Sequence, residues 1–281
     1  MRKTLIALFL CVFPFVIKGQ APFPSGNEIK QFTASITCAV LESGNPVWNT
    51  YISRGMKEFW TITPFEIIDY SEFEKRRDDP GYSFVILTET SFEKDKSGTR
   101  YNYINLLQGK DVEELGEMPE ICAVPLSVAE ADNMEYGNMM GPVLLFMQHH
   151  AGKISEDPSL TGRRYLRYYN RNTPEVKSRK ILVKQEDLAP SVNDQTKLRT
   201  SYKYTIEIVD EEEIVRAVKE RRPFTLILHK VGPEGNSGGG ICFKMLFGTD
   251  DSDMYYYNEH TIDRLNPGGL LPADLKRLER F

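Results

Sequence analysis

The sequence predicts an α/β chain built from two tandem copies of one folding unit. A nine-residue pattern occurs at residues 67–75 and again at 208–216, and the apolar, acidic and basic positions of the two copies largely coincide without a gap. An apolar run follows each copy, at residues 82–87 and 224–229. These patterns favour a strand end, a helix, a proline stop and a buried strand. Each unit is therefore expected to fold as strand, helix, strand, helix and hairpin on a small mixed sheet, with an α+β arrangement as the alternative.

The amino terminus has the pattern of a secretory signal peptide at residues 1–19. Arg2 and Lys3 precede an apolar run at residues 5–17, and the small residue Gly19 follows. Cleavage after Gly19 would leave 32 basic and 40 acidic residues, a net charge of −8. An acidic protein of this kind is a poor candidate for general nucleic-acid binding. Residues 20–34, rich in Pro, Gly and polar side chains, are expected to form a loose leader.

The first domain is expected to occupy residues 35–152. The Asn-Pro pair at residues 45–46 is typical of a helix start, and Gly55 is expected to let that helix pack closely against the sheet. Ser71 and Glu74 have the spacing of a capping box for a second helix. The strands of this domain are predicted at residues 36–41, 65–69, 82–87 and 101–107, with a short strand from residue 121.

The centre of the chain contains an apolar segment and a basic one. Residues 139–151 are apolar almost all round, which is typical of a helix buried on more than one side. We expect this helix to lie against the first sheet and to meet the second domain. Residues 153–178 are the predicted linker, and residues 179–281 the second domain. Its strands are predicted at residues 180–184, 204–209, 224–228, 241–247 and 254–259, and its helices at residues 195–202, at residues 211–221 and from Pro272.

At the level of this layout the chain resembles a known group of periplasmic domains. The order strand, helix, strand, helix, hairpin is similar to the amino-terminal domain of TolB and to the related modules of CsgG and LpoB. The residues behind the comparison are 180–183, 206–211 and 225–228. The resemblance covers one repeat at a time and implies a non-catalytic envelope domain that contacts other proteins, with no site residues to carry over.

Three cysteines would remain after cleavage, each in an apolar run typical of a strand. Cys38, Cys122 and Cys242 are interpreted as buried thiols. A bridge between Cys38 and Cys122 is the alternative, if their strands are neighbours in an oxidising compartment. The odd number means that at least one thiol stays outside any disulfide within the chain.

The four histidines give no convergent site. His149 and His150 precede Gly152 and are expected at a helix end, where a positive charge is favoured. His229 follows a central strand and could lie at a sheet edge. His260 is expected to be exposed near acidic residues.

Two further loops contain partial motifs. Residues 235–240 satisfy Gly-x-Ser-x-Gly with Ser237 and resemble a phosphate loop, but neither motif has its required strand and helix context. A hairpin loop is the preferred interpretation. Asp250, Asp251 and Asp253 lack the glycine and the distant glutamate of a calcium loop, so a polar turn between strands is expected.

The best binding candidate is the basic and aromatic stretch at residues 163–171. Arginine forks can hold anions while tyrosine rings stack on sugars; the alternative is a linker helix that pairs with acidic side chains. The candidate binding residues are Arg163, Arg164, Tyr165, Arg167, Tyr168, Tyr169 and Arg171.

The functional expectation is an exported, non-catalytic cell-envelope binding or scaffolding protein, periplasmic or extracellular. No catalytic residue, metal ligand or cofactor is predicted, and no membrane span is expected after cleavage because the apolar run is short. An envelope protein or a glycan is the expected partner. The alternative is a hydrolase acting on a glycan or peptide, with carboxylates in the cleft between the domains, although no carboxylate pair among 40 acidic residues stands out.

Overall fold

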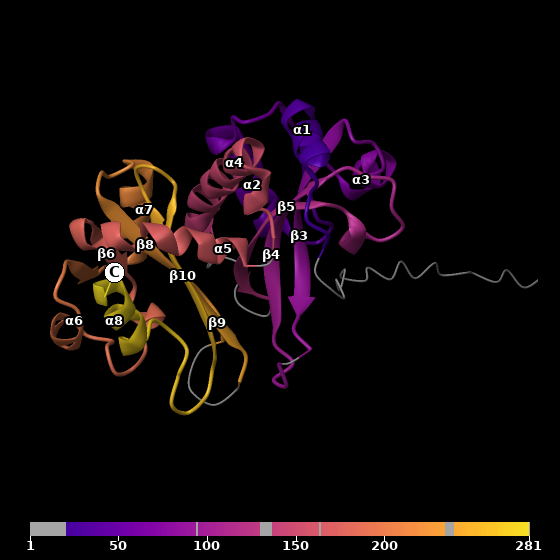
Figure 1. Cartoon of the computed structure of the whole chain (residues 1–281). Helices are drawn as coiled ribbons and strands as arrows, with labels where there is room; N and C mark the ends of the chain where they lie inside the picture. Colours follow the sequence, from indigo (N-terminus) through magenta and orange to yellow (C-terminus); the bar gives the residue numbers. More distant parts are fainter. Residues whose placement is uncertain (1–20, 94, 130–136, 163, 234–238, 281) are drawn as a thin grey trace, which may run out of the picture.

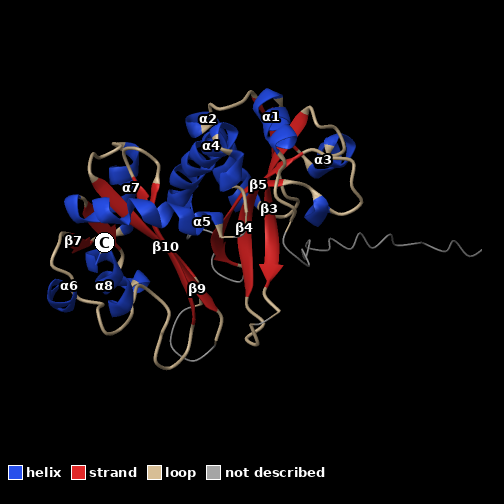
Figure 2. Ribbon diagram, viewed as in Figure 1, coloured by secondary structure: helices blue, strands red, loops and turns tan. Residues whose placement is uncertain are grey.

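A computed structural model of the chain describes residues 21–93, 95–129, 137–162, 164–233 and 239–280. The predicted signal peptide, Arg163 and Ser237 lie outside the described residues. The described chain contains two five-stranded mixed sheets with helices packed on them (Figures 1 and 2). The first sheet has the order β2-β1-β3-β4-β5. Its strands are β1 (Ile36–Val40), β2 (Phe65–Ile68), β3 (Tyr82–Ser91), β4 (Arg100–Gln108) and β5 (Glu120–Val128).

The second sheet repeats the topology of the first. Its order is β10-β9-β8-β6-β7, in which β6 pairs in parallel with β7 and β8, and β9 is antiparallel to β8 and β10. The same relations hold in the first sheet for β1 with β2 and β3, and for β4 with β3 and β5. The predicted duplication is therefore confirmed. The strands are β6 (Lys180–Val183), β7 (Ile206–Ile208), β8 (Thr225–Val231), β9 (Ile241–Gly248) and β10 (Met254–Thr261).

Strand pairing sets the residue correspondence between the two modules. Ile36 pairs with Tyr82, and Lys180 pairs with Thr225. Tyr82 therefore corresponds to Thr225. The predicted apolar runs, which begin at Tyr82 and Phe224, would have made Tyr82 equivalent to Phe224, so that alignment is wrong by one residue. We call β1 to α4 the first module and β6 to α8 the second module.

The helices between the strands begin with equivalent caps. Asp69 accepts a hydrogen bond from the backbone N–H of Glu72 at the start of α3 (Tyr70–Arg76), and Asp210 accepts one from Glu213 at the start of α7 (Glu211–Lys219). The expected cap at Ser71 is wrong because Asp69, two residues earlier, already satisfies the first turn. The other helices are α2 (Pro46–Phe59), α6 (Gln195–Ser201) and α8 (Pro272–Arg280).

The expectation of a loose leader is wrong for α1 (Gly26–Ala34). Ser25 and Glu28 form a capping box at its start, and Ile29 and Phe32 are buried in the core. A short helix with two buried apolar side chains and a complete cap is stabilised by this packing despite its polar composition.

The apolar helix α4 (Met140–Glu156) lies between the two sheets (Figure 1). It continues through Gly152, so the expected helix end at His149 and His150 is wrong; Ile154 is buried and its packing outweighs the low helix propensity of glycine. Gly55 of α2 faces α4 rather than the sheet. A Cβ on Gly55 would approach Leu144 Cδ1 to 2.7 Å.

One hydrophobic core extends through both modules. On the first sheet it covers the face under α1, α2 and α4, and on the second it covers the face under α7, with Ile214, Phe243 and Phe247. The modules therefore pack through non-equivalent faces. The outer face of each sheet has a core of its own, under α3 in the first module and under α6 and α8 in the second.

Candidate functional site

The predicted arginine and tyrosine stretch forms α5 (Tyr165–Tyr168) and the start of η4 (Tyr169–Ser178), which lie beside β10. We call residues 164–178 the strap. The Tyr165 hydroxyl accepts a hydrogen bond from the Ala123 N–H and donates one to the Ala123 carbonyl at 2.7 Å. These backbone groups lie on β5, the outer strand of the first sheet. Tyr165 therefore covers part of that sheet edge.

The strap also covers the edge of the second sheet. The Asn170 side-chain amide donates to the Tyr257 carbonyl at 2.9 Å and its oxygen accepts from the Tyr257 N–H at 2.6 Å. Asn172 and Thr173 donate to the carbonyls of Met254 and Tyr255, each at 2.9 Å. Polar side chains thus replace a neighbouring strand along β10, which protects the edge from pairing with other chains.

The aromatic rings of the strap point in different directions. Tyr169 is buried and its hydroxyl bonds His150 Nδ1 at 2.9 Å. The His150 ring stacks on Tyr165, and its burial lowers the pKa of His150 to about 3, so the ring is neutral. Tyr168 is half-buried, and the Arg171 guanidinium lies 5.0 Å from its ring centroid.

The arginines of the strap lie on the surface. Arg164 and Arg171 are exposed, and Arg167 pairs with Glu259 of β10 at 2.9 Å. Ligand binding by these arginines stays a prediction. The contacts of the tyrosines are structural ones, within the protein.

The structure also has a pocket between the modules, with a volume of about 540 Å³. It lies at the carboxyl ends of β6 and β8, beside the first residue of α7, which is where ligands commonly bind in parallel sheets. The opposite wall comes from the end of β5 and from η2 (Gly137–Met139). The first module contributes Leu126, Ser127, Val128, Asn138 and Met139, and the second contributes Lys184, Glu186, Asp187, Glu211, Ile214 and residues 228–233.

Charged side chains of both signs line this pocket. Lys184 pairs with Glu186 at 3.0 Å, and Lys230 lies 3.9 Å from Asp187. Burial alone would raise the pKa of Glu186. A hydrogen bond from the backbone and the contact with Lys184 outweigh this effect, so the pKa of Glu186 lies below its ordinary value. The carboxylates of these two pairs therefore face lysines, in a pocket that can offer both charges to a ligand.

The expectation that His229 lies at a sheet edge is wrong. His229 is a buried residue of the central strand β8 and lines the pocket. Its Nε2 lies 3.0 Å from the Pro125 carbonyl of β5, so its N–H donates a hydrogen bond to the first module. Burial lowers the pKa of His229 to about 4. A neutral ring held by a carbonyl on this nitrogen connects the two modules at the base of the pocket.

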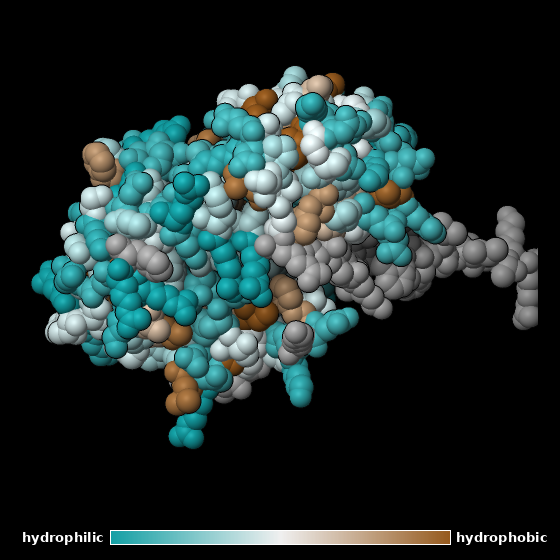
Figure 3. All heavy atoms as spheres, viewed as in Figure 1, coloured by the Kyte–Doolittle hydropathy of each residue, from teal (hydrophilic) through white to brown (hydrophobic). Residues whose placement is uncertain are grey.

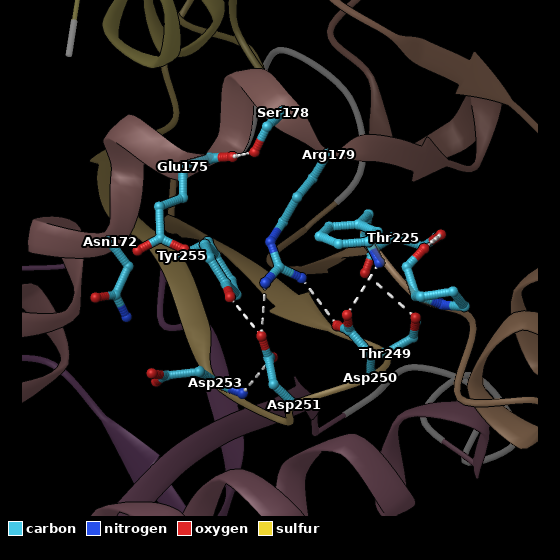
Figure 4. A network of polar contacts seen from close by, with 12 residues as sticks. Asn172, Glu175, Ser178, Arg179, Thr225, Thr249, Asp250, Asp251, Asp253 and Tyr255 are labelled. Carbon is cyan, nitrogen blue, oxygen red and sulfur yellow. Dashed lines mark hydrogen bonds and ion pairs between the residues drawn. The ribbon is translucent and has the colours of Figure 1, made fainter.

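Asp250 and Asp251 of the β9–β10 turn bind the Arg179 guanidinium (Figure 4). The guanidinium bonds Asp250 and Asp251, each at 2.8 Å, and lies 4.2 Å from the Tyr255 ring centroid. Asp253 faces Lys153 and His149 of α4. The preferred interpretation of a polar turn is confirmed. The turn holds Arg179, the residue that follows the strap, and Asp253 connects α4 to the second module.

Sequence reasoning missed a fully buried ion pair. The side chains of Lys244 and Asp274 are 0% and 1% exposed and lie 2.8 Å apart. Lys244 also donates to His260 Nδ1, and Tyr256 and Asn258 donate to Asp274. His260 is therefore partly buried and hydrogen-bonded, not exposed as expected. The lysine and aspartate are 30 residues apart, so no local pattern signals the pair.

The thiol prediction is confirmed for the three cysteines of the described chain. Cys38, Cys122 and Cys242 are buried and free. Cys38 on β1 and Cys122 on β5 belong to strands that are not neighbours, which rules out the alternative bridge. Burial raises the pKa of Cys38 to about 11, so this thiol is a weak nucleophile at neutral pH.

Within the residues that the structure describes, no group of histidines, cysteines and acids is arranged to hold a metal ion. The helices of that same part of the chain are too short or too polar to span a bilayer. Comparisons with protein-family models, with curated proteins and with solved structures found no match for the chain.

Proposed function

We propose that the chain is an exported, non-catalytic binding protein of the cell envelope, and that a small polar ligand occupies the pocket between its modules. The observation that carries this proposal is a pocket with walls from both modules, placed at the carboxyl ends of β6 and β8. Its volume of about 540 Å³ is within the ordinary range for small-molecule sites. Export is proposed from the basic, apolar and small-residue pattern at residues 1–19.

The charges of the pocket favour a zwitterionic ligand, such as an amino acid or a short peptide. Lys230 is the cation best placed for the ligand's carboxylate, because its distance of 3.9 Å from Asp187 is longer than a direct hydrogen bond. Glu211, at the first position of α7, is available for the ligand's ammonium group. A ligand of this class would satisfy both signs of charge at once.

A hydrolase is the weaker alternative. Glycoside hydrolysis needs one carboxylic acid with a raised pKa beside a second carboxylate. The pocket instead pairs Glu186 with Lys184, and the pKa of Glu186 is lowered. This pairing favours a carboxylate that stays charged and does not transfer a proton.

The proposal is tested by thermal unfolding of residues 20–281 with free amino acids, dipeptides and amino sugars as probes. We expect an amino acid or dipeptide to raise the melting temperature, and Lys230→Met to abolish that rise. Lys180→Met is the matched control, because Lys180 pairs with Glu207 and does not line the pocket. A panel with no binder would contradict the proposed ligand class, and hydrolysis of a dipeptide would favour the enzyme.

A further inference from the structure

The two sheets differ at one pair of equivalent edges. β2 and β7 are the outer parallel strands of their sheets, and Phe65-Glu66-Ile67 corresponds to Ile206-Glu207-Ile208. In the second module, Ile181 N–H donates to the Thr205 carbonyl and Val209 N–H donates to Val183. The backbone groups of Ile206 and Ile208 must therefore point away from β6, toward the free edge.

In the second module a glutamine covers this edge. The Gln195 side-chain amide donates to the Ile206 carbonyl at 2.9 Å, and its oxygen accepts from the Ile208 N–H at 3.1 Å. These are the two groups that an added strand would use. Gln195 thus occupies the place of a neighbouring strand and blocks pairing at β7.

In the first module the same groups have no partner within the described part of the chain. Thr37 N–H donates to Pro64 and Leu41 N–H donates to Ile68, so the N–H and C=O groups of Phe65 and Ile67 point outward. Gln195 is the first residue of α6, whereas the first residue of α2 is Pro46, which has no side-chain amide. The fold is repeated, but the group that covers the edge is not.

The side chains of β2 define what such an edge would accept. Phe65 and Ile67 are half-buried and pack against the shared core, so their outer parts extend an apolar surface on one face. Glu66 is exposed on the other face and lies beside Arg76 at 2.7 Å. An extended segment with apolar residues on one face and a basic residue on the other would match both faces.

A second copy of this chain is a poor occupant. In a symmetric antiparallel pair of β2 strands, with Phe65 opposite Ile67 of the second copy, Glu66 would face its own equivalent. Like charges directly opposite each other destabilise a strand pair. Arg76 offsets part of this repulsion because it pairs with Glu66 within each chain. In this register a second copy still fits the edge less well than a segment that places a basic side chain opposite Glu66.

We propose that β2 binds an extended segment of a partner polypeptide by strand addition, antiparallel to β2 and with a basic side chain opposite Glu66. Backbone hydrogen bonds at Phe65 and Ile67 would hold the segment, as in other cases of strand addition. This interaction does not involve the pocket, and either can exist without the other.

The test uses the chain from residue 20 and a seven-residue peptide of alternating valine and lysine. We expect saturable binding in the micromolar to millimolar range, because a short ladder offers only a few hydrogen bonds. Hydrogen exchange supplies the position: the Ile67 amide should exchange rapidly in the free protein and become protected by the peptide. The Ile208 amide should be protected with or without it.

Matched variants separate strand addition from general attraction between an acidic protein and a basic peptide. Glu66→Lys should weaken binding about tenfold, and should favour a valine–glutamate peptide instead. Glu207→Lys makes the same charge change on the covered edge and should leave affinity unchanged. A valine–lysine peptide with methylated backbone nitrogens, which cannot form the ladder, should not bind.

Several outcomes would overturn the proposal. Equal weakening by Glu66→Lys and Glu207→Lys would indicate non-specific charge attraction. Protection of the Ile67 amide in the free protein would mean that the edge is already covered. A concentration-dependent dimer in sedimentation experiments, lost on Ile67→Pro, would assign the edge to a second copy.

Discussion

The two modules have the same strand order, yet their last helices have opposite characters. Helix α4 is apolar and buried against both sheets, whereas α8 is amphipathic and covers the outer face of the second sheet only. The strand residues beneath them differ accordingly. Pairing along β3–β4 and β8–β9 makes Ile104 of the first module equivalent to Lys244 of the second. The two modules therefore share strand order and helix caps, but the side chains that contact the last helix are apolar in the first module and include a buried charge in the second.

The face of the molecule seen in Figure 3 is mainly hydrophilic, with scattered apolar residues. Among the described residues, the large apolar side chains that are well exposed are Val215, Phe224 and Leu265. Single residues of this kind are ordinary on a soluble surface. The features proposed to bear on function are therefore the pocket and the free edge at β2.

The largest effect is expected at the buried ion pair. Asp274→Ala should lower the free energy of unfolding by about 3–5 kcal/mol, because it leaves Lys244 charged and buried without its carboxylate. Chemical denaturation measures this loss. The double variant Lys244→Ile and Asp274→Leu, which copies the apolar solution of the first module, should recover most of it. A loss below about 1 kcal/mol for Asp274→Ala would show that the pair does not hold α8.

A slightly smaller effect is expected at the contact between the modules. Phe146 of α4 packs on Phe247 of β9 and on Tyr169 of the strap, with ring centroids 5.5 and 4.9 Å apart. Phe146→Ala should cost about 3–4 kcal/mol through the cavity that it leaves. Because the core is shared, calorimetry of the unmodified chain should show one unfolding transition. Two separate transitions before mutation would contradict a single core.

Glu120, the first residue of β5, is equivalent to Met254, the first residue of β10. Because Glu120 is ionisable and Met254 is not, only the first module is expected to have a pH-dependent contribution to stability at this position. Protein surrounds most of the Glu120 carboxyl group, and this desolvation raises its pKa from 4.5 to about 7. Between these values the folded protein binds more protons at Glu120 than the unfolded chain does, so stability falls as pH rises through this window.

The Glu120→Gln variant measures how much the ionisation of Glu120 changes the stability of the fold. It should be about 1–3 kcal/mol more stable than the unmodified chain at pH 8, and nearly equal to it at pH 4. Denaturation curves at both pH values measure the difference. Glu117→Gln, at the end of η1 (Leu115–Glu117) just before β5, is the control for the loss of one acidic side chain in this region. Equal stability of Glu120→Gln and the unmodified chain at pH 8 would place Glu120 in water.

The smallest effect is expected at the covered edge. Gln195→Ala removes two hydrogen bonds to β7, but water can reach the freed backbone groups, so a loss of about 1 kcal/mol is expected. The informative result is hydrogen exchange at Ile208, which should accelerate toward the rate at Ile67. Unchanged exchange at Ile208 would mean that Gln195 does not account for the difference between the edges.

Much of the fold follows from local signals. The periodic apolar residues of α7 identify this helix, because an amphipathic face involves residues a few positions apart. The start of α3 was expected at Ser71, two residues after its actual cap at Asp69. The errors have local causes as well. The polar composition of residues 26–34 masked two buried side chains, and Gly152 suggested an end for α4 although Ile154 packs beyond it.

The sequence by itself determined the duplicated order of strands and helices, since each unit repeats the same short-range pattern. Only the tertiary structure decided the pairing of Lys244 with Asp274, the pocket between the modules, and which sheet edges are covered by Tyr165, Asn170 and Gln195. The physical reason is that a strand or a helix start depends on near neighbours along the chain. A buried charge, a pocket wall or a covered edge depends on which distant side chains meet when the two modules pack.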